Sequence, residues 1–291
     1  MNERLPVKVC GRWFTSGDVE AIRSLTQETP PLNRAEIARR TCAHLDWRGP
    51  DGRLKAMSCR VALLRLKDQG WIQLPPPRNG NGNGRPYCAA WTIPAREKPW
   101  VCSLVDLKGV ALRPVSDRGD SRQWNEAISR FHYLGFQPLP GAQMRYLIEC
   151  EGGLVGAIGF GASAWKVAPR DRWIGWTPEQ RVARLPWVVN NARFLILPWI
   201  RCANLASWVL SHAARRLPAD WEGRYGYRPV LLETFVERDR FRGTCYRAAN
   251  WRPVGLTQGR GKLDRRHAYA LPVKEVFLYP LQRNFREVLC A

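Results

Sequence analysis

One apolar run that ends in polar side chains constrains this fold more than any other part of the sequence. The run Val-Leu-Leu at residues 230–232 predicts a buried strand, because it is short, continuous and apolar. Glu233 and Glu237 follow at its end, and a short helix carrying Cys245 and Tyr246 comes next. Ligands of α/β sheets usually bind where strand ends feed loops. We therefore expect an α/β (α+β) domain with its functional site at this strand end.

The first 95 residues predict a separate small domain that precedes it. Asn33 can cap a helix, with Glu36 completing a capping box, and Gly70 can end another helix. The predicted helices cover residues 18–25, 34–45 and 54–69, and the predicted strands cover residues 71–74 and 87–93. This order is typical of a winged helix-turn-helix, with the Pro/Gly/Asn loop at residues 75–85 as its wing. Residues 96–291 then form the larger domain.

The charge balance indicates a polyanionic partner. Lys and Arg number 46 against 25 Asp and Glu, a formal net charge of +21. Such an excess favours DNA or RNA, since cations neutralise phosphates. The third predicted helix and the wing supply the side chains that we expect to bind duplex DNA: Lys55, Ser58, Arg60, Arg65, Arg78 and Arg85. We expect no membrane attachment, because no lipidation motif and no apolar span of membrane length is found.

Two further stretches suit contacts with nucleic acid strands. Trp173 and Trp176 alternate with arginines, a pattern that suits stacking on unpaired bases, although a tryptophan-rich packing shell would leave the same pattern. Arg260 and Lys262 belong to a glycine-rich basic loop that can close over a phosphate backbone or form a solvated hairpin. Arg193 lies in a strand, residues 187–197, that is too polar for a plain core strand.

A turn into a helix follows that strand and offers an anion site. The N–H groups at the helix start, beside Arg201, can bind an anionic group. The residues Arg201-Cys-Ala-Asn204-Leu-Ala206 resemble the Arg-x-x-Gly-x-Gly/Ala pyrophosphate loop of GNAT acetyltransferases, and Tyr246 followed by Asn250-Trp251 resembles a second motif of that superfamily.

The GNAT resemblance covers roughly residues 120–272 and implies a mixed-sheet domain. It implies that Arg201, Asn204, Ala206 and Ser207 hold an acyl-CoA, while Tyr246 acts as general acid and Glu233 as base. Asn204 replaces a glycine whose role is close backbone approach to coenzyme A, so acyl-CoA is the weaker cofactor candidate.

A second resemblance rests on longer motifs. Trp173-Ile-Gly-Trp176, the stretch from Asn190 to Arg201 and the stretch from Glu233 to Trp251 are similar to the DruA-like family. That family includes proteins of the Druantia anti-phage systems and proteins linked to transposable elements. The resemblance implies a role in phage defence or DNA mobility, with other defence or transposition proteins as partners.

Three hypotheses for the function stay open at this point. If the protein cuts or joins DNA strands, the acidic candidates for a Mg²⁺ site are Asp171, Glu233, Glu237 and Asp239. Tyr246, His132 or Cys245 would then serve as nucleophile or general base. The same carboxylates can instead pair with neighbouring arginines. The other two hypotheses are an N-acyltransferase and a non-catalytic adaptor.

Cysteine usage and the N-terminus indicate a cytoplasmic protein. The 9 cysteines are scattered and never spaced as CxxC, so we expect reduced thiols and no zinc site. The first residues lack the apolar region of a secretory signal.

Overall fold

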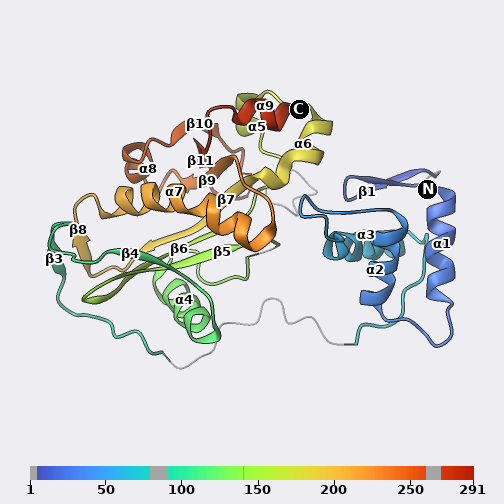
Figure 1. Cartoon of the computed structure of the whole chain (residues 1–291), viewed down its shortest axis with the longest axis horizontal. Coiled ribbons are helices and arrows are strands. Elements are labelled where there is room, and N and C mark those ends of the chain that lie inside the picture. Colours follow the sequence, from blue (N-terminus) through green and yellow to red (C-terminus); the bar gives the residue numbers. More distant parts are fainter. Residues whose placement is uncertain (1–4, 79–90, 140, 260–269) are drawn as a thin grey trace. The chain divides into compact units, whose positions relative to one another are not determined.

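A computed structural model describes residues 5–78, 91–139, 141–259 and 270–291. The chain divides into two compact parts, Met1–Asn83 and Gly84–Ala291, which we call unit 1 and unit 2 (Figure 1). The division therefore falls before residue 91 rather than after residue 95. Thr92 and Ile93 account for this difference, because their backbone N–H groups donate to the carboxylate of Glu126 in unit 2, at 2.8 Å each.

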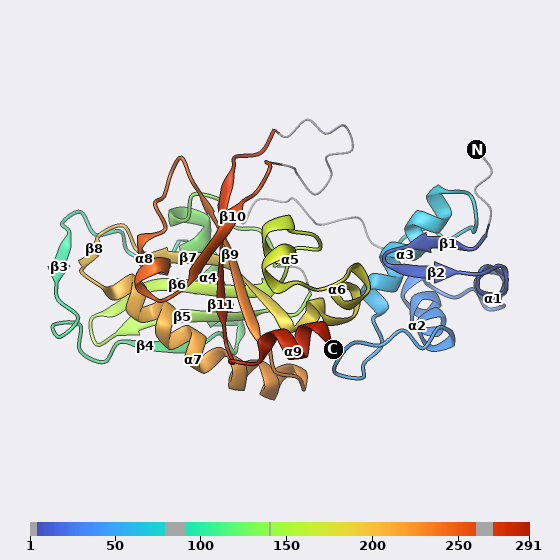
Figure 2. The ribbon, with the colours of Figure 1, turned by 90° about the horizontal axis from the view of Figure 1, so that it is seen from above.

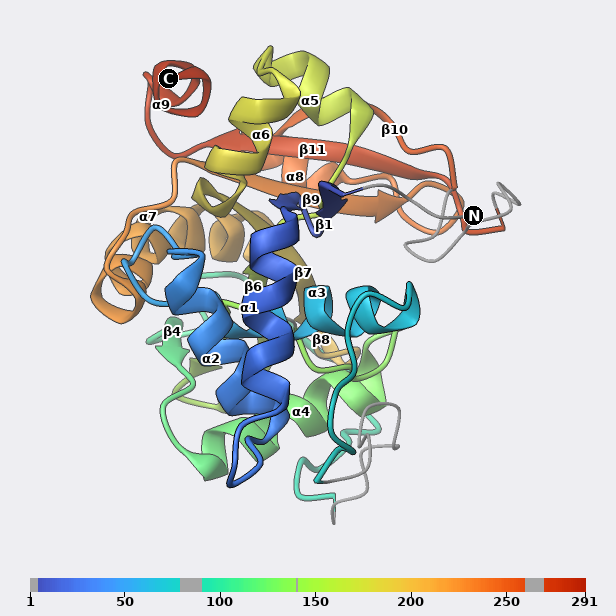
Figure 3. The same cartoon turned by 90° about the vertical axis from the view of Figure 1, so that its right-hand side faces the viewer.

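Unit 1 contains a short hairpin and three helices, shown in Figure 3. The elements are β1 (Val7–Val9), antiparallel to β2 (Arg12–Phe14), then α1 (Ser16–Thr26), α2 (Arg34–His44) and α3 (Ala56–Asp68). Asn33 caps α2 as expected, its side chain accepting from the N–H groups of Ala35 and Glu36. Phe14, Ile37 and Leu66 are buried in the core of the unit. The hairpin was not predicted, because each strand is only three residues long.

The strand predicted at residues 71–74 does not form, which is a correction. The N–H of Trp71 instead donates to the carbonyl of Leu66 at the end of α3. The carbonyl of Trp71 accepts from the side chain of Arg23. Ile72 is buried in the core, so side-chain packing rather than a strand ladder holds this segment. Residues 91–93 are likewise not a strand. The rest of that predicted strand, residues 87–90, and residues 79–85 of the predicted wing lie outside the described residues. The winged helix therefore stays a prediction.

Unit 2 is built on a seven-stranded sheet in the order β10-β11-β9-β7-β6-β5-β4. The strands are β4 (Ala111–Pro114), β5 (Met144–Cys150), β6 (Gly153–Ala162), β7 (Val188–Ile196), β9 (Leu231–Glu237), β10 (Arg252–Leu256) and β11 (Lys274–Pro280). Neighbours are antiparallel except β7 and β9, which are parallel. The sheet is thus mixed, as expected. A separate parallel pair joins β3 (Trp100–Cys102) to β8 (Ile200–Cys202).

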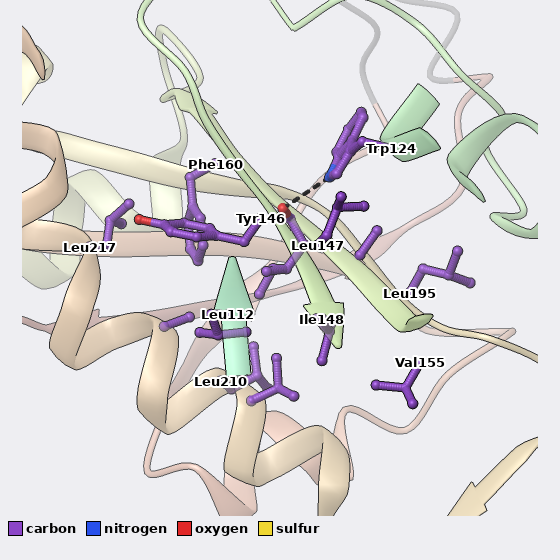
Figure 4. Close-up of a cluster of buried hydrophobic side chains, with 14 of the residues drawn as sticks. Leu112, Trp124, Tyr146, Leu147, Ile148, Val155, Phe160, Leu195, Leu210 and Leu217 are labelled. Atoms are coloured by element: carbon purple, nitrogen blue, oxygen red, sulfur yellow. Dashed lines mark hydrogen bonds between the residues drawn. The ribbon is translucent and has the colours of Figure 1, made fainter. Parts of the chain in front are cut away.

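Two long helices cover opposite faces of this sheet (Figures 1 and 2). They are α4 (Arg118–Phe131) and α7 (Leu205–Tyr225), and the shorter helices are α5 (Ala168–Ile174), α6 (Pro178–Arg184), α8 (Thr244–Ala248) and α9 (Phe285–Cys290). In Figure 4 Trp124 of α4 lies on one side of the strands and Leu210 and Leu217 of α7 lie on the other. Among the described helices none is long and apolar enough to cross a membrane.

The glycines of β6 serve close packing rather than phosphate binding, as predicted. A Cβ on Gly156 would collide with the carbonyl oxygen of Leu195, and one on Gly159 would lie 2.6 Å from the ring of Trp124. That ring donates its Nε1–H to the carbonyl of Ile158 at 3.2 Å. The register between β6 and β7 shifts beside Gly159, so the glycine also marks a bulge.

Candidate functional site

The polar strand end that the sequence singled out lies where β7 and β9 part. These parallel strands pair only from Val188 to Asn190 and from Leu231 to Glu233. Beyond those residues β7 stays with β6, and β9 stays with β11. We call this parting the fork.

Hydrogen bonds hold the fork together just past its last paired residues. The hydroxyl of Thr234 donates to the carbonyl of Asn191 at 3.0 Å. Tyr246, from α8, donates to the Oδ1 of Asn191 at 2.8 Å, and the Nδ2 of Asn191 donates to the carbonyl of Gly159 at 3.2 Å. The polar side chains predicted here thus bind one another rather than face an open cleft.

Glu233 is enclosed in an ion-pair network. Its carboxylate accepts from Arg170 at 2.7 Å and from the N–H of Ala164 at 2.8 Å, and both charged side chains are 0% exposed. Arg170 also pairs with Asp171 at 2.8 Å, and Asp171 pairs with Arg181 at 3.3 Å. Burial raises the pKa of Glu233, and the charge of Arg170 opposes that rise. Two positive and two negative charges therefore balance inside the unit.

This network engages carboxylates for which metal and acid–base roles were predicted. Within the described ranges, no three His, Cys, Asp or Glu side chains gather as a metal site. Glu233 and Asp171 are engaged by arginines, Glu237 lies 3.5 Å from Arg240, and Asp239 is exposed in the following turn. The alternative of pairing with arginines accounts for Asp171, Glu233 and Glu237.

Of the predicted nucleophiles of α8, Tyr246 is buried and Cys245 is half-buried. Tyr246 packs against Phe277, with ring centroids 5.7 Å apart, and burial raises its pKa. Burial raises the pKa of the Cys245 thiol too, which favours the unreactive protonated form. Neither group is presented as an activated nucleophile.

His132 lies at the end of α4. Its Nδ1 accepts from the N–H of Leu134 at 3.2 Å. Burial, together with the positive charge of Arg193, lowers the pKa of His132 to about 4. Its ring stacks on Tyr133, which the sequence analysis had not selected.

The turn into α7 has a non-glycine residue in the left-handed conformation at the helix start. Asn204 has φ 62°, in the left-handed region that favours glycine, and its carbonyl accepts from the hydroxyl of Ser207 at 3.0 Å. Arg201 is exposed and Ala206 half-buried, but β8 intervenes before the turn and is paired with β3. Asn204 stands where the GNAT pattern has a glycine that permits close approach of coenzyme A, so this turn departs from what the GNAT-type cofactor requires.

The tryptophans predicted to stack on bases pack against other side chains of unit 2. Trp176 is buried, with the guanidinium of Arg170 5.4 Å from its ring. Trp173 stacks on Phe285 at 5.1 Å, and Arg286 lies 4.6 Å from its ring. These contacts fit the alternative of a tryptophan-rich packing shell. Phe285 of α9 packs on Trp173, which lies more than a hundred residues earlier in the chain.

The predicted DNA-binding side chains of unit 1 lie on α3 and beside it. Ser58, Arg60 and Arg65 are exposed, whereas Lys55 precedes α3 and is half-buried, which lowers its pKa. A groove of ≈ 350 Å³ runs beside α3. It is lined by Asn33, Arg34, Ala35, Arg60, Leu63, Leu64, Leu74, Pro77 and Arg78. Arg34 was not among the predicted DNA-binding residues, although its position at the start of α2 could have indicated a phosphate contact. Arg85, Arg260 and Lys262 lie outside the described residues.

The sheet order and the fork give unit 2 the mixed sheet that the GNAT resemblance implies. A family model described as Druantia protein DruA matches residues 103–271, more than half of the chain. The chain belongs to the DruA family.

Similar solved structures are acetyltransferases, and the likeness is loose. They include the polyamine N-acetyltransferase of Drosophila melanogaster (12% identity, 59% of this chain and 99% of that chain, TM-score 0.37). A putative GNAT acetyltransferase of Desulfovibrio desulfuricans has 10% identity over 60% of this chain and 100% of that chain, with a TM-score of 0.36. A GNAT acetyltransferase of Bacillus cereus has 11% identity over 48% and 71%, with a TM-score of 0.30. None of the curated proteins compared with the chain matches it. Structural likeness at TM-scores this low does not support a conclusion about function.

Proposed function

We propose that this DruA-family protein binds duplex DNA through unit 1, in the cytoplasm, as a component of an anti-phage defence system. One observation carries the proposal: three arginines, Arg34, Arg60 and Arg78, line the groove beside α3. None of the described residues that line it carries a carboxylate. A surface whose arginines have no carboxylate partners suits phosphate contacts. The formal net charge of the chain, +21, also favours a polyanionic ligand.

The helices support a specific way of docking. Cys59, Leu63 and Leu66 bury one face of α3, which leaves Ser58, Arg60 and the rest of the opposite face exposed. An exposed helix of this kind can enter the major groove while the start of the preceding helix approaches the backbone. In this arrangement Arg60 would reach bases or phosphates from α3, and Arg34 and Arg78 would contact phosphates on either side.

The test uses the full chain with the double substitution Arg60→Gln and Arg78→Gln. Fluorescence anisotropy with a labelled duplex, repeated over a salt series, gives both the affinity and its salt dependence. Losing two phosphate contacts should weaken binding and make the slope of log K against log salt shallower by about 2. Arg39→Gln is the matched control, since Arg39 is exposed on α2 but its charge is already offset by Glu36.

Unchanged affinity and slope in the double variant, or an equal loss in the control, would contradict DNA binding by this face. The defence role is tested separately, in cells carrying the complete system of which the protein is part. The double variant should lower protection against phage, measured by plating efficiency. Full protection with the double variant would separate the defence role from this DNA contact, and the family's link to transposition would then be the role to examine.

N-acyl transfer is a second candidate, favoured by the parting of β7 and β9 after Asn190 and Glu233. In that case Asn204 must move aside before a pyrophosphate can approach the start of α7. Calorimetric titration with acetyl-CoA tests the candidate directly, and an absence of binding would remove it.

A further inference from the structure

A compact group of aromatic and arginine side chains forms where the end of α4 meets the turn after β9. The rings of His132 and Tyr133 stack with centroids 4.9 Å apart and planes at 29°. Phe241 meets Tyr133 edge to face at 5.2 Å, and the guanidinium carbon of Arg240 lies 5.0 Å from the Tyr133 ring centroid. We call these four residues the stacking cluster. Two segments about a hundred residues apart in sequence build it.

The cluster is exposed on its outer side. Tyr133 is 36% exposed, Phe241 is 46% exposed, and the Arg240 side chain is 54% exposed. A single exposed aromatic residue needs no explanation in a globular protein. Here, however, the exposed rings are held by one another and by an arginine, so they form a preorganised surface. That surface presents a π-face and a guanidinium side by side.

Arg193 of β7 gives the cluster a second ligand-binding feature. Its charge acts on both His132 and Tyr133, which places it beside their rings. The Nε of Arg193 is buried and has no hydrogen-bond acceptor within the described part of the chain. The Nη1 of the same guanidinium donates to the carbonyl of Ala192 at 2.7 Å. Buried donors are normally paired in folded proteins, so the Nε has capacity for one further acceptor, which a ligand or a water can supply.

The nearby carboxylates do not cancel this positive charge. Glu237 lies 3.5 Å from the Nε of Arg240 and is 14% exposed, and it offsets part of that arginine's charge. The following turn adds Arg238, Asp239 and Arg242, all exposed. With Arg193 and Arg240 included, four arginines face two carboxylates around the stacking cluster.

We infer that the stacking cluster binds an unpaired base of a single-stranded nucleic acid. Phe241 and Arg240 would form the platform for the base, and Arg193 would donate to a phosphate oxygen of the same strand. Aromatic faces and guanidinium planes both stack on bases, and they do so with little sequence preference. The inference rests on the proposed nucleic-acid role of the protein, but it assigns a second contact, in unit 2. It also replaces the predicted stacking by Trp173 and Trp176.

The experiment uses the full chain that already carries Arg60→Gln and Arg78→Gln, so that binding by unit 1 is reduced. Labelled oligo(dT) and oligo(rU) are titrated in separate arms and followed by fluorescence anisotropy. Phe241→Ala should weaken binding about tenfold, because it removes one base-stacking contact. Phe241→Trp keeps an aromatic face and should restore the affinity.

Trp165→Ala is the matched control. Trp165 is 51% exposed and has the guanidinium of Arg181 6.0 Å from its ring, so it offers a similar exposed aromatic–arginine pair elsewhere in unit 2. Its removal should leave both affinities unchanged. Circular dichroism of Phe241→Ala should match that of the parent, which is expected for an exposed side chain.

The loss and its restoration by tryptophan, in either arm, support the inference, and the arm with the larger change tells whether DNA or RNA is the ligand. Parental affinity of Phe241→Ala in both arms would overturn it, and so would an equal loss with Trp165→Ala. Binding of neither oligonucleotide by any variant would also overturn it, and would point to a protein partner for this surface. Failure of the duplex-binding proposal would be seen in a different measurement: the affinity for duplex DNA would not change in the Arg60→Gln, Arg78→Gln variant.

Discussion

Replacing Glu233 with Gln tests whether the strand end is a structural junction, as the structure indicates, or an active site. The substitution keeps the shape of the side chain and removes its negative charge. Arg170 then loses the partner at 2.7 Å, while both side chains stay fully enclosed. The network changes from two charges of each sign to two positive charges against Asp171 alone.

Removing one partner of a buried ion pair typically costs about 3–5 kcal/mol, because the other charge stays buried without compensation. A domain's whole stability is about 5–15 kcal/mol, so Glu233→Gln should remove about a fifth of it or more. The matched control is Glu237→Gln, further along the same strand. Its pairing with the exposed Arg240 at 3.5 Å is worth about 0–1 kcal/mol.

Urea unfolding followed by tryptophan fluorescence measures the free energies. Hydrogen exchange read by mass spectrometry assigns the change to unit 2, where peptides from β9 should lose protection while peptides from α1 to α3 keep theirs. The double substitution Arg170→Met with Glu233→Leu leaves Asp171 paired with Arg181, so it should be less destabilised than the two single changes added together. A Glu233→Gln protein as stable as the Glu237→Gln control would refute the reasoning.

Three further predictions concern single contacts. Tyr246→Phe should cost about 1–3 kcal/mol in the free energy of unfolding, because the buried Oδ1 of Asn191 loses its donor at 2.8 Å; an unchanged urea midpoint would contradict this. Gly159→Ala should destabilise unit 2 by about 1–3 kcal/mol through its clash with Trp124, whereas Gly223→Ala, with open space around it, should be neutral or slightly stabilising. The pKa of His132 is lowered to about 4 in the fold, against about 6.5 unfolded, so the unfolded chain binds more protons between these values. Stability should therefore fall as pH drops through that window, and His132→Gln should flatten the slope in melting curves recorded across it.

Elements with strong local signals could be predicted from the sequence. Asn33 before α2 and Thr177 before α6 both cap their helices, and the β5–β6 hairpin forms around the expected turn. These signals lie within a few residues of the structure they specify. The segment at residues 71–74 shows the limit, because Ile72 reads equally well as a strand residue and as a core anchor. Only the fold around it decides between the two.

The contacts of the candidate site join residues that are far apart in the sequence, so no local sequence pattern predicts them. Glu233 was selected correctly as an unusual polar residue, but its partner Arg170 lies 63 positions earlier in the chain. The tryptophans at 173 and 176 were expected on the surface, and α9 at the far end of the sequence covers one of them. Conversely, Tyr133 and Phe241 are each ordinary in sequence, and they become noteworthy only because the fold brings their rings within 5.2 Å.

The use of polar residues in unit 2 argues for binding over catalysis at the fork. A general acid or base must reach its substrate within hydrogen-bonding distance. Glu233 and Tyr246 are both enclosed and hydrogen-bonded to protein groups, so presenting them would require breaking a buried ion pair and a buried hydrogen bond. Those two events together cost several kcal/mol before any substrate is bound. Binding a strand through Arg240 and Phe241 requires no such rearrangement, since both side chains already face solvent. Catalysis by Glu233 or Tyr246 would therefore require a rearrangement of the fork, whereas the proposed strand contact would not.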